Sequence, residues 1–359
     1  MTSRASRASR ASRVSAVESI LKALVPAYGP PGREIGVRAA LRASLRGHGR
    51  LREDALGSLH LHLPGRGPRL LLAAAMDAPG LIVTRVESNG NARVELLGGR
   101  SAAEAVGAMA LFPDGDRALV AYDRVAAGKD GGGVEASSLY LLTGLDKATA
   151  TKRFPVGSVG MFESKLDRLG DQWRAPSLDN RAGAAAVAAA LRQAKRRAYD
   201  LHVVFAAQSE LGSRGALTSA FGVEPELAVV VEVAHVGDGK DQSPVTLGEG
   251  PCVGLKEFGY VAHPRGLELA RKAAKAARVP IQYLVREEGS TDAGAVRRAG
   301  AGVPTVLIAI PARRSGGPDT LVHARDLKRT VDLVASLLAT PAASPPARRA
   351  KAPKRGGKR

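Results

Sequence analysis

Four acidic residues of this chain stand where short apolar segments end or begin. Asp77, Glu210 and Glu232 each end or follow an apolar run, and Asp179 opens a helical stretch. In an open α/β sheet such positions lie together beyond the carboxyl ends of the strands. Carboxylates gathered on one rim repel one another unless a cation, an arginine or a lysine neutralises them. The spacing therefore favours a metal site, although separate surface carboxylates that each cap a helix or join an ion pair explain it equally well.

The elements that must position these carboxylates alternate between strands and helices. Two amphipathic helices are expected near the start, around residues 17–24 and 37–45, because apolar residues recur there at helical spacing. The later strands are expected at residues 69–76, 201–207, 227–233, 281–285 and 305–310, and the helices at residues 181–198, 214–221, 265–277, 292–298 and 326–338. This alternation predicts an α/β fold with a mostly parallel sheet covered by helices.

Residues 81–165 depart from this pattern. Short alternating stretches flank Asn89-Gly90, a dipeptide typical of a tight β-hairpin turn. Several glycines follow, including Gly128 and those at 131–133. We predict a small all-β domain, inserted into an α/β domain that residues 16–80 and 166–340 form together.

The two ends of the chain are basic. The net charge is +19, and four arginines in residues 1–13 with seven basic residues in 341–359 account for eleven of these charges. Residues 1–15 and 341–359 have no apolar period and are expected to be disordered. Such tails can bind nucleic acid or anionic surfaces through phosphate contacts. Because so much of the charge lies in the tails, solvated tails without a partner are the simpler interpretation.

The cellular compartment is inferred from the cysteine content and from the lack of membrane-spanning and signal segments in the sequence. The lone cysteine, Cys252, excludes an internal disulfide framework and a thiolate zinc cluster. The apolar runs are far shorter than the roughly 20 residues that a membrane-spanning helix needs, and no signal peptide is recognisable. We therefore expect a cytoplasmic protein without membrane insertion.

Five ordered segments resemble metallopeptidase family 42, which includes glutamyl, deblocking and tetrahedral aminopeptidases and proteins named endoglucanase M. They are Ala-Ala-Met-Asp-Ala-Pro-Gly-Leu-Ile-Val at 74–83, Leu-Asp-Asn-Arg-Ala-Gly at 178–183, Gln-Ser-Glu-Leu-Gly-Ser-Arg-Gly-Ala at 208–216, Thr-Asp-Ala-Gly-Ala at 291–295, and the segment 302–311. The resemblance covers roughly residues 17–340. It implies a zinc-aminopeptidase-like fold, a dinuclear metal centre, a peptide substrate if the chain is active, and a homo-oligomer.

Part of the family's metal centre has counterparts in this chain. The resemblance places Asp179 at the bridging carboxylate, Glu210 at a metal-ligand glutamate and Glu232 at a ligand aspartate. Asp77 falls at the residue that orients a ligand histidine, but that histidine is itself replaced by Ala75.

Other functional positions of the family are lost. Ser209 stands where the family has its general-base glutamate, and Gly316 stands at the last ligand histidine. Arg314 replaces a tyrosine of the same segment. Zinc sites of this type combine imidazole and carboxylate ligands, whereas three carboxylates alone suit Mg or Mn better than Zn. We expect one weakly bound divalent metal (Mg, Mn or Zn), or none.

These losses favour a family member without peptidase chemistry. Without a Lewis acid, water keeps a pKa near its bulk value, and loss of the general base alone costs about 100- to 10,000-fold in rate. An active metal-dependent hydrolase with an altered, carboxylate-rich site is the first alternative. A basic-tailed nucleic-acid-binding module is the second.

Few other residues could replace the lost groups. His60 and His62 share one face of an apparent strand, but that strand is expected to lie away from the rim. His235 lies just beyond Glu232 and is the histidine closest in sequence to the rim, whereas His323 is expected to be structural. Ser209 could act as a nucleophile only beside a histidine base, and none is identifiable.

Positive charge could take the place of the metal. Arg313 and Arg314 lie in the last loop of the expected rim and could neutralise Glu210 and Glu232.

Overall fold

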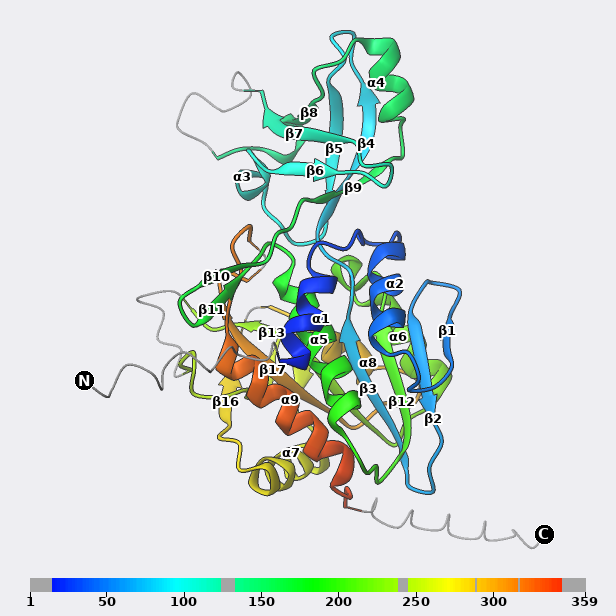
Figure 1. Ribbon diagram of the computed structural model, residues 1–359, viewed down its shortest axis with the longest axis vertical. Helices are drawn as coiled ribbons and strands as arrows, with labels where there is room; N and C mark the ends of the chain where they lie inside the picture. The colour runs from blue at the N-terminus through cyan, green and yellow to red at the C-terminus, as the bar shows by residue number, and fades with distance from the viewer. Residues whose placement is uncertain (1–14, 124–132, 238–244, 288, 316, 344–359) are drawn as a thin grey trace, which may run out of the picture.

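The computed structural model describes residues 15–123, 133–237, 245–287, 289–315 and 317–343. A large mixed sheet with helices on both faces forms one part, and a small closed barrel stands beyond one end of it (Figure 1). The basic segments predicted at 1–15 and 341–359 lie outside the described residues except for Ser15 and residues 341–343, and Gly128 also lies outside them. No helix of the described residues is long and apolar enough to cross a membrane.

The centre of the large sheet is parallel and its flanks are antiparallel. The four central strands are adjacent in the order β12 (Asp200–Ala206), β3 (Arg69–Ala75), β13 (Leu227–His235) and β17 (Thr305–Arg313). The antiparallel neighbours are β2 (Leu59–Leu63) on β12, and β14 (Cys252–Glu257) and β18 (Leu321–His323) on β17. The predicted parallel arrangement thus holds for the centre. Strand β18 follows β17 after a short loop, and a parallel pair would need a crossover of a dozen or more residues.

Short strands extend the flanks. They are β1 (Leu51–Glu53) beside β2, β11 (Gln172–Arg174) and β10 (Asp167–Leu169) beyond β18, and β15 (Tyr260–Val261) and β16 (Gln282–Val285) beside β14.

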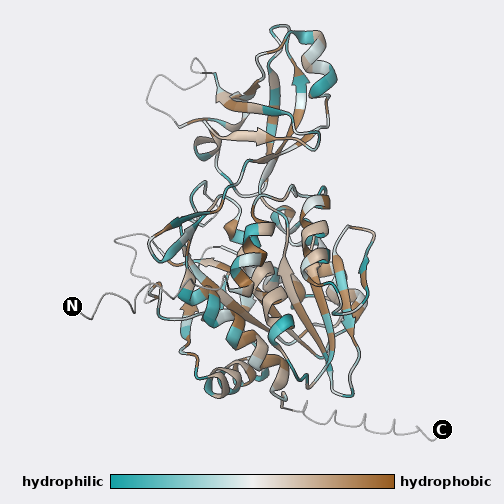
Figure 2. Cartoon of the chain, in the orientation of Figure 1, coloured by the Kyte–Doolittle hydropathy of each residue, from teal (hydrophilic) through white to brown (hydrophobic). Residues whose placement is uncertain are grey.

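Helices bury both faces of this sheet. The first apolar cluster includes residues of α1 (Ala16–Leu24), α2 (Ile35–Ser44), α5 (Leu178–Gln193), α7 (Pro264–Ala277) and α9 (Ala324–Ala339). The second cluster, on the opposite face, includes residues of α6 (Arg214–Val223) and α8 (Asp292–Val296). Figure 2 shows apolar residues concentrated in the central strands and on the helix sides that cover them.

One predicted helix differs in its bounds. We expected residues 181–198, but α5 starts at Leu178 and ends at Gln193. The chain turns to extended backbone at Ala194 and leads to Tyr199, which is buried and donates a hydrogen bond from its hydroxyl to the Thr340 carbonyl at 2.5 Å. Burying this large side chain explains why the chain leaves the helix early.

The barrel is closed by six strands. They are β4 (Gly80–Val86), β5 (Ala92–Leu97), β8 (Leu139–Leu142), β7 (Arg117–Tyr122), β6 (Met109–Leu111) and β9 (Val159–Phe162), in that order, with α3 (Ala102–Ala105) and α4 (Lys147–Arg153) outside. The predicted hairpin joins β4 to β5, and Gly90 there has the positive φ of 84° that such turns require. The barrel starts three residues after Asp77, so the chain enters it directly from the end of β3.

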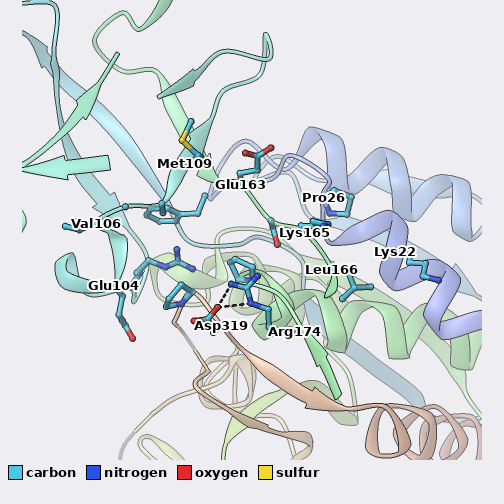
Figure 3. A pocket seen from close by; sticks show the side chains of 17 residues that line it. Lys22, Pro26, Glu104, Val106, Met109, Glu163, Lys165, Leu166, Arg174 and Asp319 are labelled. Atoms are coloured by element: carbon cyan, nitrogen blue, oxygen red, sulfur yellow. Dashed lines mark hydrogen bonds and ion pairs between the residues drawn. The ribbon is translucent and has the colours of Figure 1, made fainter. Parts of the chain in front are cut away.

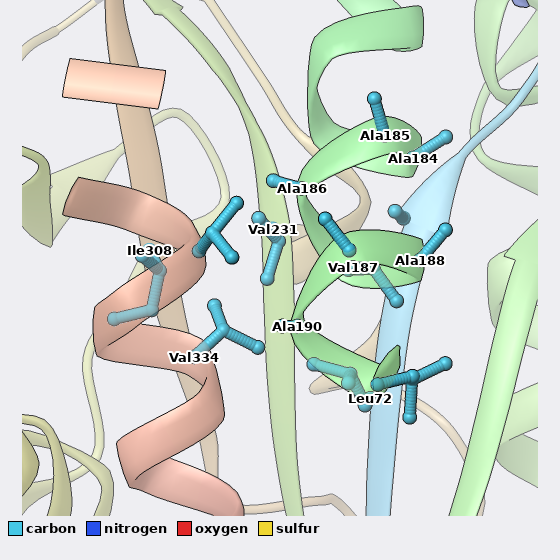
Figure 4. Packing of buried hydrophobic residues seen from close by; sticks show 14 of the residues in the cluster. Leu72, Ala184, Ala185, Ala186, Val187, Ala188, Ala190, Val231, Ile308 and Val334 are labelled. Carbon is cyan, nitrogen blue, oxygen red and sulfur yellow. The ribbon is translucent and has the colours of Figure 1, made fainter. Parts of the chain in front are cut away.

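Helix α5 is the central packing element beneath the site. Most of its residues are buried and alanine is the commonest residue among them, which lets the helix approach β13, β3 and α9 closely (Figure 4). A Cβ atom placed on Gly183 would lie 2.4 Å from the carbonyl oxygen of Val231 in β13. The small side chain at 183 is therefore a condition for this contact.

Gly183→Ala tests this condition. In a helix interior, replacing glycine by alanine normally stabilises by up to about 1 kcal/mol, but here we expect destabilisation by about 1–3 kcal/mol because the added methyl group overpacks the contact. Gly222→Ala in α6 is the matched control, since nothing lies within 4 Å of its added Cβ. Urea unfolding of both variants measures the difference, and a stabilised Gly183→Ala variant would contradict the packing argument.

Candidate active site at the carboxyl ends of the central strands

The structure brings the acidic residues singled out in the sequence to one rim. Asp77 follows β3, Glu210 follows β12 and Glu232 lies near the end of β13. Asp179 is in the first turn of α5. A cavity of about 370 Å³ at this rim is lined by residues that include Asp179, Asn180, Ser209, Glu210, Glu232, His235, Arg286, Asp292 and Ser315.

Asp77 holds the loop after β12. Its side chain is fully buried, and its two carboxylate oxygens accept hydrogen bonds from the backbone N–H groups of Ser209 at 3.1 Å and Glu210 at 3.0 Å. Burial, with the charge of Glu210 as the next cause, raises the pKa of Asp77 well above its usual value. Asp77, which was predicted to fall at the histidine-orienting position, thus positions two residues of the rim.

Two more buried charges support this loop. Glu34 accepts a hydrogen bond from the backbone N–H of Gln208, which has a left-handed backbone with φ 54°. Arg181 is fully buried, bonds to the carbonyls of Ala27 and Gly29, and places positive charge near both Asp77 and Glu34. Neither residue was assigned a role from the sequence, because their partners lie far away along the chain.

Ser209 points to a carboxylate. Its hydroxyl donates a hydrogen bond to Asp292 at 2.9 Å. A serine nucleophile would need a base that takes its proton and is held by a third group, and the partner here is one buried carboxyl group. Ser209, which was predicted to stand at the general-base position, is therefore a hydrogen-bond donor here.

The neighbours of Glu210 shift its pKa in opposite directions. Its carboxylate accepts hydrogen bonds from the Asn180 amide at 2.9 Å and from the backbone N–H of Gly99 at 3.1 Å. Burial, and then the negative charge of Asp179, raise the pKa of Glu210 to about 7, although Arg100 acts in the opposite direction. Near neutral pH this group is therefore only partly ionised.

Glu232 and Asp292 form a buried carboxyl pair. Glu232 accepts the backbone N–H of Asp292 at 3.1 Å, and the two side chains are also hydrogen bonded to each other. Burial, with the neighbouring Asp292 charge second, raises the pKa of Glu232 well above its usual value. Two carboxyl groups in hydrogen-bond contact must share a proton. Asp292 was missed as a site residue, although its segment was among the motifs quoted from the sequence.

In the loop after β17, Ser315 and Arg314 each contact an acidic residue. Ser315 donates a hydrogen bond to Asp179 at 2.8 Å, and Arg314 forms an ion pair with Asp319 at 3.8 Å. The cation whose charge lowers the pKa of Glu210 is Arg100, from the segment between β5 and α3. The predicted neutralisation of Glu210 and Glu232 by Arg313 and Arg314 remains a prediction. Gly316, the lost histidine position, lies outside the described residues.

Of the histidines considered from the sequence, His235 lines the cavity at the rim. His235 ends β13, is exposed and lines the cavity. His323 caps α9 by accepting the backbone N–H of Arg325, which is the structural role expected for it. His60 contacts Asp54 at 2.9 Å and Ser219 at 3.3 Å. Ala75, at the lost ligand position, is buried beside Ala206 of β12.

These donors do not fit a dinuclear zinc centre. Such a centre needs nitrogen ligands beside carboxylates, and the rim carboxyl groups are engaged with backbone N–H groups, hydroxyls and each other. In the described part of the chain, no three potential ligands at this rim have ligand atoms within 4.8 Å of one another.

A larger cavity lies next to the rim. It has a volume of about 1010 Å³. Its lining comes from α1, from the barrel, and from the segment that follows β9 as far as β11 (Figure 3). Arg100 is buried in its wall, stacks on Phe162 at 4.1 Å and contacts the carbonyl of Gly317. Because Gly99 lines the smaller cavity and Arg100 the larger one, the two spaces adjoin. The carboxyl cluster lines only the smaller space.

Stability should depend on pH through Glu210. Its pKa in the folded protein, about 7, is above the ordinary value of 4.5, so the folded state binds more protons between these values. Its contribution is fully present below about pH 4.5 and is lost as pH rises through 7, on the order of 3 kcal/mol in total. Glu210→Gln should flatten this decline between pH 5 and pH 7.5.

Urea unfolding of chelator-treated protein across this pH range measures the effect. Glu268→Gln, which removes an exposed carboxylate of α7, is the control and should leave the decline unchanged. Equal slopes for Glu210→Gln and the unmodified chain would refute the assignment of the proton to Glu210.

Comparison with known proteins identifies the family. The model of the M42 glutamyl aminopeptidase family matches residues 57–333. A lysyl aminopeptidase of Pyrococcus furiosus is 28% identical over 335 residues, which cover 89% of this chain and 96% of that protein. The solved aminopeptidase APDkam598 of Desulfurococcus kamchatkensis has 26% identity and a TM-score of 0.85, over 91% of this chain and 95% of that chain.

A more distant solved structure shares the fold. It is the TET1 peptidase of Pyrococcus horikoshii, which can assemble into a tetrahedron or a large octahedral shell; its TM-score is 0.78 at 20% identity, over 90% of this chain and 99% of that chain. The resemblance drawn from the five sequence motifs is confirmed by a family match that spans most of the chain, and the chain belongs to the M42 glutamyl aminopeptidase family.

Proposed function

We propose that this chain is an M42-family scaffold whose rim no longer carries out metal-dependent peptide hydrolysis. The observation that carries the proposal is the state of the rim carboxyl groups. Glu210 is bound to the Asn180 amide and to the backbone N–H of Gly99, Glu232 to Asp292, and Asp179 to Ser315. These contacts occupy lone pairs that a cation would need.

The residues that this chain lacks would serve two needs of the reaction, the Lewis acid and the base. Peptide hydrolysis at a metal centre needs a Lewis acid that activates water and polarises the carbonyl, and it needs a base that accepts the water's proton. Ala75 offers no ligand, and the Ser209 hydroxyl is committed as a donor to Asp292. The loss of the base alone lowers the rate by about 100- to 10,000-fold.

A second candidate is an active hydrolase with a carboxylate-rich site for Mg or Mn. Asp179, Glu210 and Glu232 still line one cavity, and His235 on its wall supplies a nitrogen donor. An oxygen-rich site of this kind would require the Glu232–Asp292 pair to release its shared proton when the metal binds.

Cleavage assays separate the two candidates. We expect no hydrolysis of aminoacyl p-nitroanilides above background with Zn, Co, Mn or Mg, because the chain lacks both nitrogen ligands and the base. Hydrolysis that depends on Mn or Mg and disappears in Glu210→Gln would overturn the proposal and support the second candidate.

Restoring the family's residues provides the positive control. The triple variant A75H/S209E/G316H should gain metal-dependent hydrolysis, because it returns two imidazoles and a carboxylate to a rim that keeps Asp179 and Glu210. Circular dichroism and unfolding curves check that the triple variant folds. A folded, metal-loaded variant without activity would show that the loss involves more than these three positions.

The assembly is also a proposal. The distant TET1 peptidase with the same fold assembles into closed shells, and we infer that this chain forms a homo-oligomer, which light scattering tests directly. The nucleic-acid alternative gains no support from the family comparison, and the basic tails that would carry it lie outside the described residues. A cytoplasmic location stays a prediction.

A further inference from the structure

A cluster of two histidines and one aspartate lies at the edge of the sheet opposite the rim. His62 of β2 is paired directly with His202 of β12 in the antiparallel register, so both side chains project from the same face. Asp200 precedes His202 by two residues and shares that face because side chains alternate along a strand. Asp200 is also opposite Arg69, the first residue of β3, whereas the rim follows the last residue of β3.

Both imidazoles lie beside the carboxylate of Asp200. The Nε2 atom of His62 is 2.8 Å from one carboxylate oxygen of Asp200, and the Nε2 atom of His202 is 3.5 Å from the other. The imidazole rings are stacked, with centroids 4.2 Å apart and an angle of 16° between their planes. One ligand atom from each residue lies within 4.8 Å of the others, and these are the residues of the described chain that meet this criterion.

We propose that His62, Asp200 and His202 form a binding site for a transition-metal ion, most suitably Zn²⁺. Two imidazole nitrogens and one carboxylate oxygen are the mixed donor set that zinc prefers. This is the donor set that the rim lacks.

The surroundings allow an ion to enter and to be coordinated. The side chains are partly exposed, His62 at 46%, His202 at 19% and Asp200 at 23%, so water can supply the remaining ligand. Zinc bound at about 2.0–2.2 Å holds its ligand atoms roughly 3.4 Å apart. Zinc binds in the plane of each imidazole, so the two stacked rings need to tilt until both Nε2 atoms face the ion. Each imidazole would bind as a neutral ring that keeps its proton on Nδ1.

The strands beneath the cluster fix its geometry. Leu61 and Leu63 of β2 and Leu201 and Val203 of β12 alternate with the histidines and point into the first apolar cluster on the other face. A register shift by one residue would expose these side chains, so the pairing of His62 with His202 is strongly specified. Arg69 adds positive charge near His202, which weakens but does not block cation binding.

His60 shows that spacing alone does not make a ligand. It lies two residues before His62 and on the same face of β2, but its ring contacts Asp54 and Ser219, and it lies opposite Val204. His60→Ala is therefore the matched control, because it removes an imidazole from the same strand and face while leaving the proposed ligands in place.

Zinc titration of tag-free, chelator-treated protein tests the proposal. By calorimetry we expect one Zn²⁺ per chain, with Co²⁺ giving the absorption of a four-coordinate ion. His62→Gln and His202→Gln should each weaken binding by at least about 100-fold, above the 10- to 100-fold typical of losing an outer-shell partner. His60→Ala and Glu210→Gln should retain it, and circular dichroism checks that each variant folds.

Several outcomes would overturn the site. Absence of zinc binding by the unmodified chain would show that Asp200 only accepts hydrogen bonds from two histidines. Unchanged affinity in the His62→Gln/His202→Gln double variant would place the ion elsewhere, and loss of binding in Glu210→Gln alone would place it at the rim. The test measures metal binding and not peptide cleavage, so its result is independent of the proposed loss of peptidase activity.

Discussion

Burial of several carboxyl groups at one rim is the constraint on which the rest of this site depends. Asp77, Glu232 and Asp292 are buried close together, and Glu210 beside them is half-buried. Charged groups in such a place are costly unless they are paired or hydrogen bonded. The chain meets this cost with backbone N–H donors, with a proton shared between two carboxyl groups, and with the buried cations Arg100 and Arg181.

This solution explains how the fold could persist after the proposed loss of metal ligands. Asp77 joins the end of β3 to the loop after β12, and Glu232 joins β13 to the start of α8. Replacing either carboxyl group would leave buried N–H groups without partners, which costs about 1–3 kcal/mol each. Retention of acidic residues at a family's metal positions is therefore no proof of metal chemistry, because these residues also connect the strands of the rim.

The sequence predicted the rim because its signal is local. The strands that precede Asp77 and Glu210 and that end near Glu232 are strongly apolar, and the carboxyl-end rule then brings their ends together. Asp292, Glu34 and Arg181 were missed since their contacts join segments far apart in the chain, although Asp292 and Arg181 lie within motifs quoted from the sequence. The flanking strand β16 was predicted at residues 281–285, whereas β10, β11 and β18 were missed because each has three residues and its direction depends on loop length.

The histidines also show that a sequence pattern does not identify contacts between segments that are far apart in the chain. A period of two along β2 suggests His60 and His62 as partners, but the register between β2 and β12 pairs His62 with His202 instead. Sequence spacing gives the face of a strand, and only the neighbouring strand gives the partner. Because the proposed His–Asp–His site and the acidic rim lie at opposite ends of β12, about 20 Å apart at the usual rise per residue, each can hold or lose a cation independently. Zinc found in this protein would then say nothing about hydrolysis until the ligands that hold it are known.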